Sequence, residues 1–145
     1  MSTRSLPSRQ PSERDAIIMD ALEIPATTRT PQVSFNFPEH RFRLIGESYP
    51  EDVTRFYYPL FDALDAYLQA SPTHCRFDFE LIYFNSSSAK AIMLLMDKLD
   101  QAASRGCRVD VYWFHDPEDD TMEELGVDFG EDLREVNFRL ERMVV

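Results

Sequence analysis

Residues 75–114, CRFDFELIYFNSSSAKAIMLLMDKLDQAASRGCRVDVYWF, decide the fold of this chain. Residues 75–84 alternate apolar and polar side chains and become apolar on both faces near Phe84, which predicts a strand whose C-terminal end is buried. One face of this strand carries Phe77, Phe79, Leu81 and Tyr83. Residues 86–105 have helical apolar spacing closed by Gly106, and residues 107–114 return to a strand pattern. This order predicts a βαβ unit with parallel strands.

The residues before this unit predict a hairpin and a further helix. Residues 33–37 and 41–45 each alternate apolar and polar side chains around a Pro-Glu-His turn, and Gly46 ends the hairpin. We expect the helix to begin at Ser48, with Glu51 three residues later as in a capping box, and to bend near Pro59. Its core-facing stripe comprises Val53, Phe56, Tyr57, Leu60, Phe61, Leu64, Tyr67 and Leu68.

The C-terminal part is acidic. Residues 116–135 hold ten carboxylates and one arginine, and we expect a short helix there, followed by a strand near 136–143. The predicted fold class is therefore α/β, a small mixed β-sheet with helices packed against it, in the order β-β-α-β-α-β-α-β. We expect residues 22–145 to form one domain. Residues 1–21 are expected to be a disordered N-terminal extension, in which residues 15–22 could form a helical turn or two.

Composition narrows the classes of function. The chain has 145 residues and a formal net charge of -11, so its field repels phosphate backbones and anionic membranes, and we expect no nucleic acid or membrane partner. No apolar run approaches the length of a membrane span or of a signal-peptide core.

The two cysteines, Cys75 and Cys107, could meet on adjacent strands, but two inert buried thiols in a reducing cytoplasm are the better interpretation.

Three consecutive serines stand where the buried strand becomes a helix. Parallel order brings residues 85–88 and 115–119 to the same edge of the sheet, where α/β folds usually place their working loops. One serine could be a helix N-cap, or one could be a phosphoacceptor whose phosphate meets free amides and the positive end of the helix dipole. A nucleophile such as Ser86 with His115 as its base is disfavoured, because no Gly-x-Ser-x-Gly elbow is present.

The acidic residues after the next strand form a second candidate site. His115, Asp116, Glu118, Asp119 and Asp120 offer oxygen ligands for Mg²⁺ or Ca²⁺. Their spacing lacks the glycine and the terminal glutamate of an EF-hand loop, so a solvated acidic loop is the preferred interpretation and we expect no metal.

Four motifs, in this order along the chain, resemble the SiaC family of bacterial regulatory phosphoproteins, and the resemblance extends from about residue 22 to 140. They are Thr30-Pro31-Gln32-Val33, Gly46-Glu47-Ser48-Tyr49-Pro50-Glu51-Asp52, Tyr83-Phe84-Asn85-Ser86-Ser87-Ser88-Ala89-Lys90 and Val111-Tyr112-Trp113-Phe114-His115-Asp116-Pro117. The resemblance implies a fold similar to the STAS domains of anti-sigma factor antagonists, with a phosphorylatable hydroxyl at a helix N-terminus.

The same resemblance implies a non-catalytic partner switch without a cofactor. A serine/threonine kinase would modify the chain, a phosphatase would restore it, and the unmodified form would activate a diguanylate cyclase that controls biofilm formation or aggregation. The implied phosphoacceptor is Ser86, with Ser87 in reserve. The expected partner-binding residues are Asn85, Ser86, Ser87, Ser88, His115 and Asp116. The alternative is a STAS-like module that binds a small molecule or nucleotide.

Overall fold

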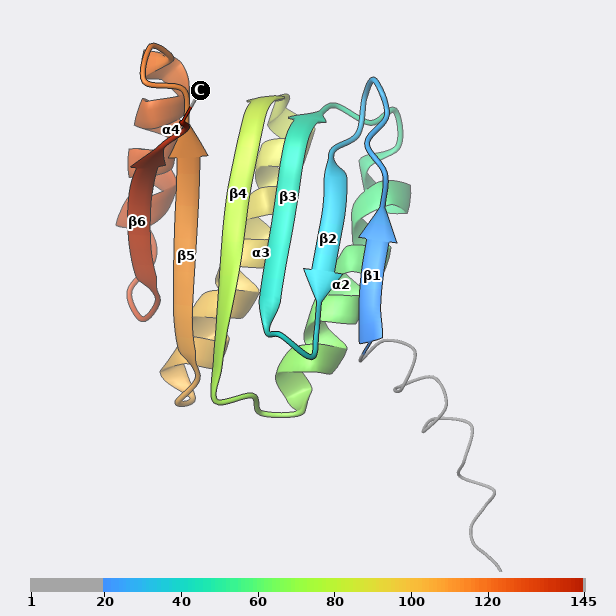
Figure 1. Ribbon diagram of the computed structural model, residues 1–145, viewed down its shortest axis with the longest axis vertical. Coiled ribbons are helices and arrows are strands. Elements are labelled where there is room, and N and C mark those ends of the chain that lie inside the picture. Colours follow the sequence, from blue (N-terminus) through green and yellow to red (C-terminus); the bar gives the residue numbers. More distant parts are fainter. Residues whose placement is uncertain (1–19, 145) are drawn as a thin grey trace, which may run out of the picture.

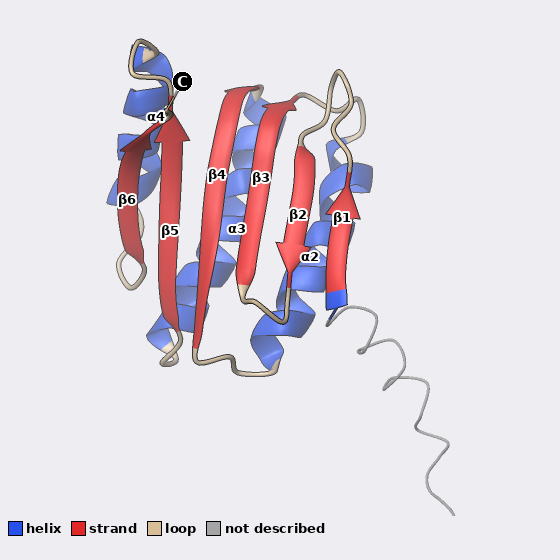
Figure 2. Cartoon of the chain, viewed as in Figure 1, coloured by secondary structure: helices blue, strands red, loops and turns tan. Residues whose placement is uncertain are grey.

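The computed structural model describes residues 20–144, which form one six-stranded sheet and three helices. The elements are β1 (Ala21–Ile24), β2 (Gln32–Asn36), β3 (Arg41–Ser48), α2 (Val53–Gln69), β4 (His74–Phe84), α3 (Ser86–Ser104), β5 (Arg108–His115), α4 (Asp120–Glu131) and β6 (Asn137–Arg142). The helices cover one face of the sheet and leave the other face open (Figure 1). Figure 2 shows the loops gathered at the two edges where strands begin and end.

The sheet is mixed, and its strands lie side by side in sequence order. β1, β2 and β3 pair antiparallel, whereas β3 through β6 are all parallel, so the predicted hairpin and βαβ unit are confirmed. The predicted order lacked β1, which is an additional strand before the hairpin. Ala21 and Leu22 belong to this strand, so the helical turn predicted there is wrong at these two residues. The rest of that predicted turn, residues 15–19, lies outside the described residues.

The core between sheet and helices is rich in aromatic rings. Phe77 stacks on Phe79 with ring centroids 4.4 Å apart, and Phe79 lies 5.9 Å from Trp113. The predicted stripe of α2 faces this core, with Leu60 and Leu64 fully buried. Burial of so many large apolar side chains is the main favourable term in folding.

A β-bulge corrects the prediction for the end of β4. Gly46 of β3 pairs with Leu81, but the next residue, Glu47, pairs with Tyr83, so Ile82 is an extra residue. Because an extra residue exchanges the two faces of a strand, Tyr83 turns away from the core and Phe84 turns toward it. Ile82 and Tyr83 are 53% and 52% exposed, so the C-terminal end of β4 is not buried as predicted.

The start of α2 also differs from the prediction. The N-cap is Asp52, whose Oδ1 accepts a hydrogen bond from the Arg55 amide at 3.0 Å. Ser48 is instead the last residue of β3 and is fully buried. The helix continues through Pro59 to Gln69. Asp supplies the side-chain oxygen that an N-cap needs, so the sequence contained two adequate candidates four residues apart.

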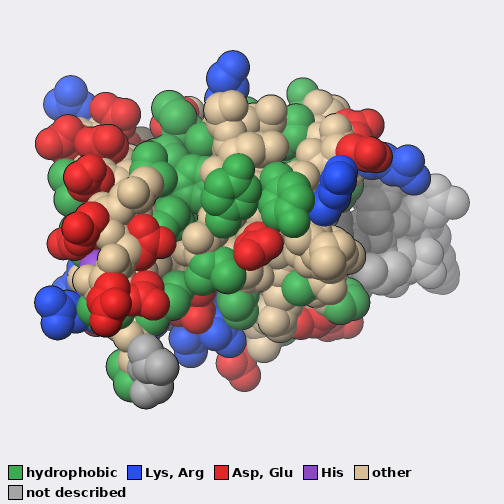
Figure 3. Space-filling view, turned by 90° about the horizontal axis from the view of Figure 1, so that it is seen from above, with side chains coloured by type: hydrophobic (Ala, Val, Ile, Leu, Met, Phe, Trp, Pro, Cys, Tyr) green, Lys and Arg blue, Asp and Glu red, His purple; other side chains and the backbone are tan. Residues whose placement is uncertain are grey.

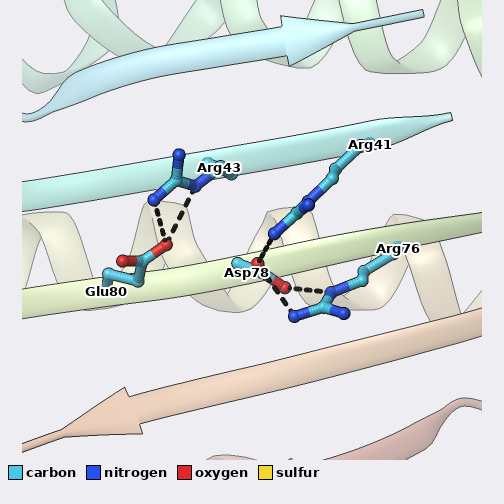
Figure 4. A network of polar contacts seen from close by, with 5 residues as sticks. All are labelled: Arg41, Arg43, Arg76, Asp78 and Glu80. Carbon is cyan, nitrogen blue, oxygen red and sulfur yellow. Dashed lines mark hydrogen bonds and ion pairs between the residues drawn. The ribbon is translucent and has the colours of Figure 1, made fainter. Parts of the chain in front are cut away.

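The open face of the sheet carries an ion-pair network (Figure 4). Asp78 is only 1% exposed, and it accepts hydrogen bonds from Arg41 at 3.0 Å and from Arg76 at 2.8 Å. Arg43 pairs with Glu80 one step further along the same strands. Two arginines satisfy the Asp78 carboxylate, as a nearly buried charge requires.

Close packing fixes α4 against β5 and β6. Trp113 donates a hydrogen bond from Nε1 to the Met122 carbonyl at 2.9 Å. A Cβ at Gly126 would lie 2.6 Å from Leu140 Cδ2 and would also collide with the Trp113 ring, so only glycine allows this approach. The predicted acidic helix and final strand are thus confirmed.

Within residues 20–144, no helix combines the length and apolar character needed to cross a membrane.

Candidate regulatory site at the N-terminus of α3

Asn85 immediately precedes α3 and is its N-cap. Its backbone is extended, and its Oδ1 accepts a hydrogen bond from the Ser88 amide at 2.9 Å. The backbone N–H of Asn85 donates a hydrogen bond to the Ser48 backbone carbonyl at the end of β3, at 3.2 Å. The cap is therefore asparagine, not one of the serines. This frees the serine hydroxyls for other roles.

The three serines that follow have different environments. Ser86 and Ser87 occupy the first two positions of α3 and are exposed, whereas Ser88 is fully buried. The backbone N–H groups at the first two helical positions have no intrahelical acceptor, and the dipole of the helix is positive there. A phosphate on Ser86 or Ser87 would therefore meet a favourable local field.

A buried chain of hydroxyls lies beneath this turn. The Ser48 Oγ lies 2.8 Å from the Ser88 Oγ and 2.6 Å from the Tyr57 Oη. All three side chains are at most 1% exposed. Burial raises the pKa of Tyr57, and the hydrogen bonds with the serines oppose that rise only in part. This chain of hydroxyls thus joins the end of β3 and the first turn of α3 to α2.

The acidic residues after β5 lie at the same sheet edge, as predicted (Figure 1). They line a shallow pocket of about 560 Å³, whose apolar wall is Ile82 of β4. The other residues that line it are Asp116, Glu118, Asp119, Asp120 and Thr121. Among the described residues, none of these four carboxylates takes part in an ion pair. Such a pocket repels phosphate-bearing ligands.

Two of these carboxylates also shape the loop. Asp116 accepts a hydrogen bond from the Glu118 amide at 2.8 Å, and Asp119 caps α4 by accepting one from Met122 at 3.1 Å. Across residues 20–144, no group of three or more His, Cys, Asp or Glu side chains is arranged to hold a metal ion. Asp116, Glu118 and Asp120 are exposed, so the loop presents these carboxylates to solvent.

His115 lies inside the protein and not on this surface. Its side chain is 5% exposed, and its Nδ1 lies 3.1 Å from the Asp116 carbonyl oxygen. Within residues 20–144, no serine of the α3 turn hydrogen-bonds to a histidine, so the structure does not bring Ser86 and His115 together as a nucleophile and its base. Of the expected partner-binding residues, Ser88 and His115 thus do not reach the surface in this conformation.

Apolar side chains surround the serine turn at the sheet edge. Exposed Tyr83 packs edge-on against Tyr49, with ring centroids 5.7 Å apart. Figure 3 views this edge from above and shows hydrophobic side chains in its middle, with acidic side chains crowded on the side of α4. An exposed apolar area with a charged rim is typical of a protein-binding surface.

The two cysteines contribute nothing to this site. Cys75 and Cys107 are buried and free, as the sequence suggested. Burial raises the pKa of both thiols, which disfavours the reactive thiolate.

Sequence reasoning missed Ser48 and Tyr57 as parts of this site. Ser48 stood in a recognised motif, but its spacing to Glu51 fitted a helix cap equally well. Tyr57 stood in the apolar stripe of α2, where nothing distinguishes a core tyrosine with a bonded hydroxyl from one without.

Within residues 20–144, helices cover one face of an α/β sheet, and two exposed hydroxyls stand at the start of α3, an arrangement that suits a small regulatory domain. The model of the SiaC family regulatory phosphoproteins matches residues 24–143. The chain therefore belongs to the SiaC family of regulatory phosphoproteins.

Individual relatives agree with this membership. An uncharacterized protein of Pseudomonas aeruginosa strain UCBPP-PA14 is 32% identical over 114 residues, which cover 79% of this chain and 90% of that protein. Apo-SiaC from P. aeruginosa superimposes with a TM-score of 0.80 at 30% identity, over 85% of this chain and 99% of SiaC. A second solved structure is the diguanylate cyclase SiaD in complex with its activator SiaC from P. aeruginosa. It matches with a TM-score of 0.81 at 30% identity, over 84% of this chain and 99% of the matched chain.

Proposed function

We propose that this chain is a phosphorylation-controlled partner switch whose unmodified form binds and activates a diguanylate cyclase. Its similarity to SiaC, the activator in the SiaD complex, supports the kind of partner. The exposed Ser86 hydroxyl at the first position of α3 is the observation that carries the switch. We take Ser86 as the phosphoacceptor and keep Ser87 in reserve, because both hydroxyls are accessible.

The contact surface of the proposal is the sheet edge around the serine turn. Asn85, Ser86, Ser87 and Asp116 would contact the cyclase directly. Buried Ser88 and His115 would act from below, by holding the turn and the acidic loop in place. A kinase and a phosphatase of the same cytoplasmic pathway would set the modification, and the output would be biofilm formation or aggregation.

Charge is the proposed signal. A phosphoserine adds roughly 1.5 to 2 negative charges at pH 7. At this edge that charge would stand near the carboxylates lining the pocket beside Ile82, so repulsion would rearrange the acidic loop and alter the docking surface. The shape of the core would change little, because Ser86 points to solvent.

Cyclase assays test the proposal. Protein with phosphoserine at position 86 and the Ser86→Ala variant are each titrated into the host's diguanylate cyclase, and cyclic di-GMP formation is measured. We expect full activation by Ser86→Ala and at least tenfold less by the phosphorylated form. Phosphoserine at position 87 is the matched control that decides between the two acceptors. Equal activation by all three proteins would remove the switch.

A further inference from the structure

A groove between α2 and α3 opens beside the serine turn. It has a volume of about 260 Å³, and its lining includes Thr54, Tyr58, Phe61, Ser87, Lys90 and Leu94. Tyr58 and Leu94 are 57% and 49% exposed, so the groove presents large apolar side chains to solvent. Apolar grooves between helices are common docking sites for amphipathic segments.

Lys90 is the one charged side chain among the residues that line the groove. It is exposed, and within residues 20–144 it takes part in no ion pair. In a chain of net charge -11, an unneutralised cation beside an apolar groove favours an occupant that carries a carboxylate.

Lys90 also stands one helical turn after both candidate phosphoacceptors. Ser86 and Ser87 precede it by four and three residues on α3, and residues at these spacings are neighbours on a helix surface. A phosphate on either serine is therefore within reach of the Lys90 ammonium. Phosphorylation would neutralise the cation and place a dianion at the mouth of the groove.

We propose that the groove between α2 and α3 docks an apolar, carboxylate-bearing segment of the partner, and that phosphorylation closes the groove by engaging Lys90. This inference rests on the proposed function for the identity of the partner. It adds the place of docking, the chemistry of the docked segment and the residue that couples docking to modification.

The first test requires no partner. The phosphate of phosphoserine at position 86 is titrated by ³¹P NMR in the parent and in the Lys90→Gln variant. The second pKa of a phosphoserine is about 6, and we expect the variant to raise it by about 0.3, because the phosphate dianion loses one ion pair at this spacing. Lys98→Gln, a lysine two turns further along α3 that pairs with Asp65, is the control and should leave the titration unchanged. Identical titrations of parent and Lys90→Gln would remove Lys90 from the switch.

The second test measures binding of unphosphorylated protein to the cyclase used above. We expect Lys90→Gln to weaken binding about fivefold and Leu94→Asp to weaken it more than about tenfold. The first removes the cation, and the second removes an apolar contact and places a carboxylate one helical turn from Lys90, where it competes with the carboxylate of the partner. Arg108→Gln, a change at an exposed residue that begins β5 at the opposite end of the strands, should bind as the parent does. Circular dichroism melts of each variant confirm that the fold is retained.

The outcomes separate this inference from the proposed function. Parent-like binding by both groove variants, with activation still controlled by phosphoserine 86, would overturn the groove and leave the switch standing. A parent protein that activates no cyclase would overturn both.

Discussion

The side-chain oxygens of Ser48 and Ser88 lie 2.8 Å apart in the core, although the two residues stand forty positions apart in the sequence. Ser48 ends β3 and Ser88 lies in the first turn of α3, so this contact holds the turn that carries Ser86. Tyr57 extends the contact to α2 through the same Ser48 oxygen. The position of Ser86 thus depends on a hydrogen-bond chain that no local pattern specifies.

Ser48→Ala should destabilise the protein more than Ser88→Ala. The first removes the hydroxyl that is bonded to two others and leaves buried polar groups short of a partner, at a cost of about 2 kcal/mol. The second removes one bond, at about 1 kcal/mol. Urea unfolding measures both, and Ser87→Ala is the control because its exposed hydroxyl should change stability by less than about 0.5 kcal/mol. Equal stability of all three variants would show that the buried hydrogen bonds among these hydroxyls contribute nothing to the free energy of unfolding.

Gly126→Ala should loosen α4 from the sheet. The added methyl would overlap the side chains of Trp113 and Leu140, so we expect a loss of about 1–3 kcal/mol in the free energy of unfolding. Trp113 is the only tryptophan and is fully buried, so a red shift of its fluorescence would report the displacement directly. Val127→Ala, at an exposed neighbouring position, should leave the emission unchanged. Unchanged emission from Gly126→Ala would contradict the tight approach.

Stability should fall at alkaline pH because of the buried thiols. The pKa of Cys75 is raised above its ordinary value of 9.0 by burial, so the folded protein keeps a proton that the unfolded chain releases. This contribution is complete below pH 9.0 and is lost as the pH rises above it, at up to about 1.4 kcal/mol per pH unit for each such group. Tyr67, whose pKa burial raises from 10.0, adds to the loss above pH 10.

Urea midpoints between pH 8 and 10.5, with reductant present, check this dependence. Cys75→Ala should have a shallower decline with pH than the parent, although its stability at pH 8 is lower. Val109→Ala makes a comparable cavity at the residue paired with Cys75 and keeps both thiols, so it should retain the parent slope. Parallel curves for Cys75→Ala and the parent would exclude the thiol as a source.

The sequence was sufficient to predict the helices and strands that have a clear local pattern of apolar residues. Alternation predicted the hairpin and β4, and helical spacing with Gly106 predicted α3, because each pattern reflects a face turned toward the core. β1 was missed because its four residues alternate too briefly to be recognised without the pairing to β2.

The errors at the site have a common physical origin in contacts between distant segments. The bulge at Ile82 depends on the register between β3 and β4, so alternation alone placed Tyr83 on the core face. The buried role of Ser48 depends on Ser88 and Tyr57, which approach it only in the folded chain. The exposed position of Ser86 was accessible to sequence reasoning, since the first residue of a helix after a strand end usually meets solvent.

Asn85 offers a way to separate charge from shape in the proposed switch. Asp and Ser are about as good at an N-cap as Asn, so Asn85→Asp and Asn85→Ser should both retain the bond to the Ser88 amide and unfold within about 0.5 kcal/mol of the parent. Only Asn85→Asp adds a negative charge next to Ser86. If phosphorylation acts through charge, Asn85→Asp should activate the cyclase several times less well than Asn85→Ser, because both variants lose the amide group and only Asn85→Asp gains a charge. Cyclic di-GMP assays with both variants decide the matter, because parent-like activation by Asn85→Asp would mean that the switch needs the bulk or geometry of the phosphate and not its charge alone.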